Sequence, residues 1–260
     1  MHTETQRAES FVQPSRAVLE ELVHAASLAP SPDNNQPWRF EQNDEGELLL
    51  LHDRTRVLPS DVDDMFSRIA LGAALENLCL AAGRRGLRAL VRHPANDDGS
   101  EVVAAIRFAE RSEADPLVGF LEQRCCCRKP YPRRSVADDS LRQLETSIAE
   151  REGMRLHWLS DRPRIRKLAW LVADADRIRF EHQPFHAELY RQLRFTPAEA
   201  EATRDGLDVR CLELPLGGAT VLRCLRFWPL MRQLTIVLDS AACSVCLRPC
   251  KCGEPARWDC

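Results

Sequence analysis

Lysine is scarce in this chain of 260 residues, which has three lysines (Lys129, Lys167 and Lys251) and 33 arginines. A GC-rich coding sequence produces this skew by itself, so we attach no function to it. Glycine and proline together make up 27 residues, too few for collagen or for a chain that is disordered throughout. With 44% hydrophobic and 29% charged residues, the composition is that of an ordinary soluble globular protein.

A strong net charge and a long apolar run are both missing. The formal net charge is -3 and the pI is about 6.2, which gives no overall attraction for nucleic acid or for an anionic membrane. No run approaches the ~18 consecutive apolar residues of a membrane-spanning helix. Residues 1–15 are polar and mixed in charge, unlike a signal peptide. We therefore expect a cytoplasmic protein with no nucleic-acid partner and no membrane.

The 11 cysteines do not have the spacing of a disulfide framework. Three are isolated, three are adjacent (Cys125, Cys126 and Cys127), and five lie between Cys243 and Cys260. Paired thiolates at short spacing suit zinc. However, no helix or strand pattern presents the last five, and an altered reading frame in GC-rich DNA gives the same composition. We expect residues 239–260 to be an unstructured Cys-rich tail without a metal, and residues 1–14 to be a flexible N-terminus.

Periodicity and capping residues predict a chain of mixed helices and strands. Helices are expected from Ser15 to Ala29, Asp61 to Arg85, Asp115 to Arg124, Ser135 to Ile148, Arg164 to Phe180, Phe185 to Leu193 and Thr196 to Asp205. Strands are expected at Glu47 to Leu51, Leu87 to His93, Val102 to Ala109 and Met154 to Leu159. The helix from Asp61, opened by a capping box at Ser60-x-x-Asp63, is apolar on most faces, including Ile69, and should be buried.

A weak internal repeat relates the two halves of the chain. Residues 51–56 and 159–164 both read L-x-D-R-x-R, and each follows a predicted strand and precedes a predicted helix. The first copy carries an insertion, residues 30–38, that the second lacks. We therefore expect residues 15–238 to form one domain from two degenerate repeats, at about 15–112 and 113–238, the second incomplete.

The inserted loop from Ala29 to Trp38 is the most informative segment. It contains three prolines, a serine hydroxyl and the amides of Asn34, Asn35 and Gln36. Such groups donate and accept hydrogen bonds around a planar polar ring, and the prolines hold them in place. From composition alone, a surface connection between a helix and a strand is the favoured interpretation.

The letters of this loop resemble a known signature. A-P-S-x-x-N-x-Q-P-W-x-F, at Ala29 to Phe40, is similar to the motif of the nitroreductase superfamily of flavoproteins, with Asn34 at the usual place and Asn35 adjacent. The segment Arg124 to Tyr131 resembles the Arg-Arg-Ser-x-Arg segment of that superfamily. Ile69 to Leu75 and Thr203 to Leu207 resemble the branch in which two nitroreductase copies are fused. The resemblance covers roughly residues 15–235.

The resemblance implies an α+β nitroreductase-like fold, with a central, mostly antiparallel sheet and helices on both sides. It also implies a pseudo-dimer of two repeats with one FMN site per chain, in a monomeric pseudo-dimer or a homodimer. The implied FMN contacts are Pro30, Ser31, Asn34, Asn35, Gln36, Arg124, Cys126 and Arg128. The chain departs from the family because cysteines replace the usual serine, and because the family pattern continues beyond Leu238.

The implied function is FMN-dependent oxidoreduction, in which NAD(P)H reduces the flavin and the flavin reduces a small-molecule electron acceptor such as a nitroaromatic or a quinone. No side chain is a convincing general acid, so no catalytic residue is assigned. Two alternatives remain: a non-enzymatic protein that binds or sequesters FMN, and an inactive truncated product.

A pair of histidines and a run of cysteines are weaker candidates for a site. His182 and His186 have the i, i+4 spacing of metal ligands, but Pro184 lies between them and no carboxylate pattern completes a site. A thiol of Cys125 to Cys127 beside arginines would have a lowered pKa, yet no partner histidine is placed near it. We therefore predict neither a metal site nor a catalytic thiol.

Overall fold

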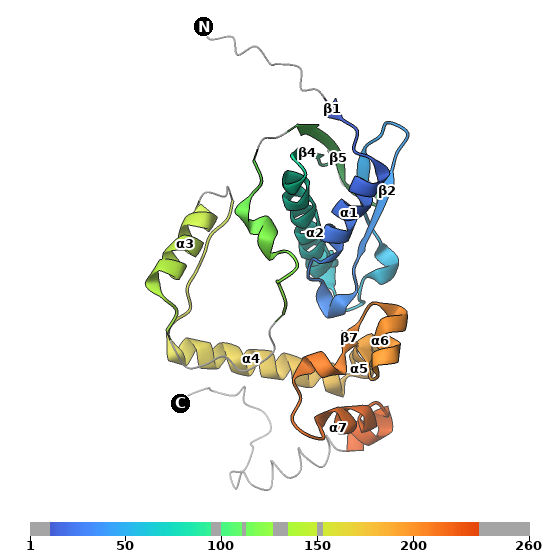
Figure 1. The fold of residues 1–260 in the computed structure, drawn as a ribbon. Coiled ribbons are helices and arrows are strands. Elements are labelled where there is room, and N and C mark those ends of the chain that lie inside the picture. Colours follow the sequence, from blue (N-terminus) through green and yellow to red (C-terminus); the bar gives the residue numbers. More distant parts are fainter. Residues whose placement is uncertain (1–10, 95–99, 111–112, 127–134, 150–152, 234–260) are drawn as a thin grey trace. The chain divides into compact units, whose positions relative to one another are not determined.

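The computed structural model describes residues 11–94, 100–110, 113–126, 135–149 and 153–233 (Figure 1). The chain forms two compact units, Met1–Arg128 with Arg191–Glu213, and Lys129–Tyr190 with Leu214–Cys260. The first unit contains the main sheet and the Ala29–Trp38 loop. The expected Cys-rich tail, residues 239–260, lies outside the described residues, as do residues 1–10 and Arg128.

The main sheet of the first unit is antiparallel throughout. Its strands are β1 (Phe11–Val12), β2 (Trp38–Gln42), β3 (Leu48–His52), β4 (Leu87–Arg92) and β5 (Val102–Glu110). β5 pairs with β4 on one edge and with β3 and β1 on the other, and β2 pairs with β3. The predicted α+β class and mostly antiparallel sheet are confirmed. β2 was not predicted, because its first residue, Trp38, was assigned to the loop.

Two helices cover one face of this sheet. α1 (Arg16–Ser27) begins at Ser15, whose hydroxyl accepts a hydrogen bond from the amide of Val18, as predicted. α2 (Met65–Arg84) lies beside α1 and packs on β4 and β3 (Figure 1). The side chains that fill this core include Leu22, Leu50, Leu71, Leu78, Ile106 and Phe108. Burying each of them fully is worth about 1.5–3 kcal/mol before entropy is counted.

The opposite face of the sheet differs from the prediction. The alternation of side chains along the strands places charged residues there: Arg39, Glu41, Arg88, Arg92 and Arg107. Among the described residues of the first unit, no helix of comparable size packs against this face. The expected second helical layer is therefore not formed within this unit.

Asp61 anchors the start of α2. The helix is preceded by a 3-10 turn (Val62–Asp64) in which Asp63 and Asp64 have positive φ. The carboxylate of Asp61 accepts hydrogen bonds from the amides of Phe66 and Ser67 and from the hydroxyl of Ser67 (2.7–2.9 Å). The prediction that Ser60-x-x-Asp63 forms the capping box was wrong, because the extra turn moves Asp61 into the capping role.

α2 is buried on one side only. Ala70, Leu71, Ala74 and Leu78 are buried, whereas Ile69 is 65% exposed, contrary to expectation. By length and composition alone, Val62–Arg84 would also be able to cross a membrane. In the first unit, one side of α2 packs on α1 and on the sheet.

The remaining elements are short or helical. The first unit also has a 3-10 helix (Pro116–Phe120), β6 (Leu193–Arg194), α6 (Pro197–Thr203), β7 (Leu207–Asp208) and a 3-10 helix (Val209–Leu212); β6 and β7 pair in parallel. The second unit has α3 (Asp138–Ala149), α4 (Arg162–Glu181), most of α5 (Gln183–Gln192) and α7 (Gly218–Cys224). The helix expected to run from Asp115 to Arg124 is only the 3-10 helix at Pro116–Phe120.

The expected strand from Met154 to Leu159 is not formed. These residues have no regular structure, and Asp161 directly caps α4 by accepting from the amide of Arg164. In the first copy of the motif, Asp53 caps a 3-10 turn (Arg54–Arg56) after β3. The two motifs thus share the capping aspartate but not the strand before it.

Candidate functional site

The Ala29–Trp38 loop has a fixed and unusual backbone. After α1 ends, Pro32–Asn34 form a 3-10 turn in which Asp33 and Asn34 have positive φ, and Gln36 also has positive φ (47°, 56° and 50°). The left-handed region costs a non-glycine residue roughly 1–2 kcal/mol. Such strain persists only where surrounding contacts hold it, and it is common at functional sites. The hydroxyl of Ser31 supplies one such contact by accepting from the amide of Gln36 (3.0 Å).

Asn35 fixes the loop from inside the protein. Its side chain is buried, and its Nδ2 donates to the carbonyl oxygen of Arg56 (2.8 Å). In return, Nη1 of Arg56 donates to the carbonyl oxygen of Asn35 (3.3 Å). The buried Oδ1 of Asn35 has no hydrogen-bond partner among the described residues. Asn35 therefore ties the loop to the segment that follows β3.

A second segment holds the other side of the loop. Nε2 of Gln36 donates to the carbonyl oxygen of Arg204 (2.7 Å), and the amide of Gly206 donates to the carbonyl oxygen of Asn34 (3.3 Å). Asp205, which lies between Arg204 and Gly206 in sequence, accepts a hydrogen bond from Nη2 of Arg194 (2.5 Å), and its carboxylate lies 3.7 Å from Nη1 of Arg56. The two segments that bind the loop are thus also joined to each other by charge.

The charges of this cluster stabilise ionised Asp205. Partial burial raises the pKa of its carboxyl group. Hydrogen bonds from Arg194 and Thr203, together with the positive charges of Arg194 and Arg56, outweigh this effect and hold the pKa below its usual value. Arg194 also donates Nε to the hydroxyl of Thr203 (2.9 Å). Gly206 has a φ of 72°, and a Cβ there would lie 2.5 Å from the carbonyl oxygen of Gln192 and 2.6 Å from Cζ of Arg194. Glycine is required at this position.

Ser31 and Asn34 are the loop residues that face outward. Asn34 is exposed and Ser31 is half-buried, whereas Asn35 and Gln36 use their amide N–H groups to hold the loop. Because Ser31 accepts from Gln36, its own O–H points elsewhere and remains a donor. Pro30 is also exposed, at the start of the loop.

Arg124 lies at the beginning of this loop. Its Nη2 donates to the carbonyl oxygen of Leu28 (3.0 Å), and its Nη1 lies 3.7 Å from Sγ of Cys126. Both residues are exposed. A guanidinium beside the end of α1 also suits the negative end of the helix dipole. The structure therefore brings the predicted Arg124 and Cys126 close to the predicted loop, although 96 residues separate Arg124 from Leu28 in sequence.

The residues that hold the loop were not predicted as site residues. Arg56, Arg194, Arg204, Asp205 and Gly206 belong here, although residues 53–56 and 203–207 attracted attention as a repeat and as a family resemblance. Gly206 follows Arg204 and Asp205 at the end of a predicted helix, which indicates a turn with positive φ. The sequence does not indicate that this turn binds a loop far away in the chain.

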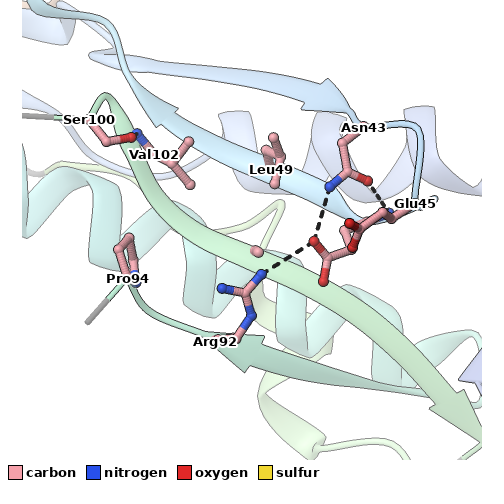
Figure 2. Close-up of a pocket in the computed structure, with 9 residues that line it drawn as sticks. Asn43, Glu45, Leu49, Arg92, Pro94, Ser100 and Val102 are labelled. Carbon is pink, nitrogen blue, oxygen red and sulfur yellow. Dashed lines mark hydrogen bonds and ion pairs between the residues drawn. The ribbon is translucent and has the colours of Figure 1, made fainter. Parts of the chain in front are cut away.

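A cavity lies on the main sheet, between the β2–β3 turn at Asn43 and Glu45 and the ends of β4 and β5 near Pro94 and Ser100 (Figure 2). Its volume is about 300 Å³, and its lining includes Asn43, Glu45, Glu47, Leu49 and Arg92. The carboxylate of Glu47 is buried and accepts from Nδ2 of Asn43 (3.0 Å), Nε of Arg107 (2.8 Å) and Nη2 of Arg92 (3.4 Å). Its charge is therefore already balanced by these neighbours.

Among the described residues, no group of three or more His, Cys, Asp or Glu side chains is placed to hold a metal ion. His186, one of the two spaced histidines, is buried in the second unit. Its Nε2 lies 2.9 Å from the carbonyl oxygen of Leu225, and its ring packs on Tyr190 and Trp228. Since a carbonyl oxygen can only accept, Nε2 carries the proton and does not ligate a metal.

Comparison with known proteins gives two curated relatives from Mycobacterium tuberculosis. No protein-family model matches the chain. It is 30% identical over 211 residues to "Uncharacterized protein MT1398" of Mycobacterium tuberculosis, covering 80% of this chain and 29% of that protein. It is 27% identical over 184 residues to "Putative NAD(P)H nitroreductase acg" of the same organism, covering 66% of this chain and 53% of that protein. The chain thus spans about half or less of the length of these curated relatives.

Solved structures similar to the chain are nitroreductase-family proteins. A Nitroreductase-like Family Protein from Bacillus cereus is 15% identical, with a TM-score of 0.34, and covers 43% of this chain and 84% of that chain. An FMN-dependent nitroreductase from Clostridium difficile R20291 is 17% identical, with a TM-score of 0.31, and covers 41% and 82%. TM-scores of this size do not establish a shared fold, so the proposals below depend on the site residues.

Proposed function

We propose that this chain binds FMN and acts as a flavin oxidoreductase, passing hydride from NAD(P)H to a nitroaromatic, quinone or similar small-molecule acceptor. The observation that supports this proposal most is that different side chains of the Ala29–Trp38 loop hold its backbone and face the accessible side. Asn35 and Gln36 hold its strained backbone, while Ser31 and Asn34 keep a hydroxyl and an amide on the accessible side. A preorganised polar loop of this kind suits a planar ring with both donors and acceptors.

The residues present fit FMN at both of its ends. The amide of Asn34 offers a donor and an acceptor for the edge of the ring, and the hydroxyl of Ser31 offers a donor. The exposed guanidinium of Arg124 offers a positive charge for the phosphate, and it has N–H groups in addition to those that contact Leu28 and Cys126. Arg128, the second proposed phosphate contact, lies outside the described residues. When bound, the flavin supplies the redox chemistry, and the role of this chain is to bind and orient it.

The name of one relative agrees with this proposal. One curated relative, 27% identical, is named as a putative NAD(P)H nitroreductase. We further propose that the active form is a pseudo-dimer of two repeats or a homodimer, as the family resemblance implies. The oligomeric state measured by light scattering with and without FMN tests this point.

The test is a spectroscopic titration of the purified chain. FMN added to the protein should give a saturable change in the visible flavin spectrum, and NADH or NADPH added without oxygen should then bleach the bound flavin. A spectrum that changes with FMN but is not bleached by either nicotinamide supports a flavin-sequestering protein instead. A folded chain that does not change the FMN spectrum at saturating concentration contradicts the proposal.

A further inference from the structure

We infer that Asp205 is a positioning residue: with Arg194 and Arg56 it forms a latch that holds the Ala29–Trp38 loop in the conformation that binds flavin. This inference rests on the proposed function for its ligand, but its structural part concerns the loop alone. The latch consists of Arg56, Arg194, Thr203, Arg204, Asp205 and Gly206. None of these residues was proposed to contact the cofactor.

The contacts show how the latch reaches the loop. The turn at Arg204 and Gly206 binds the loop through two main-chain groups, the Arg204 carbonyl oxygen, which accepts from Gln36, and the Gly206 amide, which donates to Asn34. Arg204 has a φ of 54° and Gly206 a φ of 72°, so this turn is itself in the left-handed region at two positions. Neighbouring contacts must hold that conformation, because the left-handed region is unfavourable for an arginine without such support.

The charge cluster supplies that support. Arg194 has a side chain only 14% exposed, and it donates Nη2 to Asp205 and Nε to Thr203, the residues on either side of Arg204. Its Nη1 donates to the carbonyl oxygen of Arg191 (2.7 Å). Arg194 therefore connects α5, β6 and the turn, and Asp205 is the anionic partner that keeps its guanidinium in this place.

Asp205 also faces Arg56, the residue that exchanges two hydrogen bonds with Asn35. One carboxylate thus lies between the two supports of the loop. Without its charge, the mostly buried Arg194 would lose its anionic partner, and Arg56 would keep only its ion pair with Asp53 (3.6 Å). The expected result is movement of both guanidinium groups and release of the loop from one or both supports.

The test compares Asp205→Asn with the matched variant Asp208→Asn. Asp208 also pairs with an arginine, Arg210, and is near Asp205 in sequence, but that pair is not joined to the loop. Without any flavin, hydrogen exchange of the peptide containing residues 31–37 should become faster in Asp205→Asn and stay unchanged in Asp208→Asn. With FMN, the affinity of Asp205→Asn should fall by about 10-fold, as for loss of one partner of a charged hydrogen bond. Asp205→Glu, which keeps the charge, should recover part of both effects.

Thr203→Val provides a milder change if Asp205→Asn does not fold. It keeps the shape of the side chain and removes the hydroxyl that accepts from Arg194, so it should give a smaller increase in loop exchange. Unchanged exchange and unchanged FMN affinity in Asp205→Asn would overturn the inference. Faster exchange with unchanged FMN affinity would also overturn it as a statement about the flavin site. If the unaltered chain does not bind FMN, the proposed function fails, and the exchange experiment alone then decides whether the latch holds the loop.

Discussion

Asn35 and Arg56 bind each other in both directions, since the side chain of each donates to the main-chain carbonyl oxygen of the other (2.8 and 3.3 Å). The pair is 21 residues apart and joins the strained loop after α1 to the turn after β3. This contact is the reason that Asn34 and Ser31, rather than Asn35, remain available to a ligand.

Replacing Asn35 with alanine should destabilise the protein by about 1–3 kcal/mol, because it removes the buried side chain that donates to the carbonyl oxygen of Arg56. Asn34→Gly is the matched control, since it removes an exposed amide while tolerating the positive φ at this position. Chemical denaturation measures both free energies of unfolding. Equal losses for the two variants would show that the Asn35–Arg56 pair contributes nothing specific.

Gly206→Ala should cost more free energy of unfolding than Gly217→Ala. Both glycines have positive φ (72° and 81°), so both variants carry the conformational cost of about 1–2 kcal/mol. Only at Gly206 does the added Cβ meet main-chain and arginine atoms; at Gly217 nothing lies within 4 Å. Thermal denaturation of the two variants side by side provides the comparison, and an equal drop in Tm would contradict the tight fit at Gly206.

Acid should weaken the protein partly through Asp61 and Asp205. In both, burial raises the pKa of the carboxyl group, but hydrogen bonds from Ser67 and Phe66 in one case and from Arg194 in the other leave the folded-state pKa below the usual aspartate value of 3.8. A lowered folded-state pKa gives stability that is fully present above the unfolded pKa and is lost as pH falls through the folded value. The free energy of unfolding should therefore fall steadily below pH 4, less steeply in Asp205→Asn than in the unaltered chain.

His52 should contribute a separate dependence at higher pH. It is buried at the end of β3, and its Nε2 has no hydrogen-bond partner among the described residues. Burial lowers the pKa of its imidazole from 6.5, so the unfolded chain binds the proton more readily than the folded one. Stability should decline as pH falls from 7 through 6.5 and below, and His52→Leu should remove that part of the slope. A slope between pH 7 and 5 that is identical in the variant would contradict a buried, neutral His52.

Local signals in the sequence were sufficient where local contacts decide the structure. The caps at Ser15, Asp161 and Thr196 use side chains within three residues of the amides they bind, and the helices that follow them were predicted. The strand expected at Met154 to Leu159 failed for the opposite reason: a strand exists only with a partner, and alternation of side chains does not provide one.

In the candidate site, too, the local features were predicted and the long-range contacts were not. The loop was found from its letters, but the direction of each amide depends on positive φ at Asp33, Asn34 and Gln36 and on partners 21 and 168 residues away. Periodicity contains no information about such contacts. For this reason Asn35 and Gln36, predicted as ligands beside Asn34, are found holding the loop; whether they also reach a flavin stays a prediction, as it does for Pro30 and Cys126.

The phosphate contact of Arg124 is the most direct test of the proposed FMN site. Arg124→Ala should weaken FMN binding by about 10- to 150-fold, as expected for loss of a charged hydrogen-bond partner. Riboflavin, which lacks the phosphate, should be affected much less. Arg16→Ala, at the other end of α1, removes an exposed arginine that pairs only locally with Glu20 and should leave both affinities unchanged. A loss that is equal for FMN and riboflavin, or absent for both, would contradict the assignment of Arg124 to a flavin phosphate.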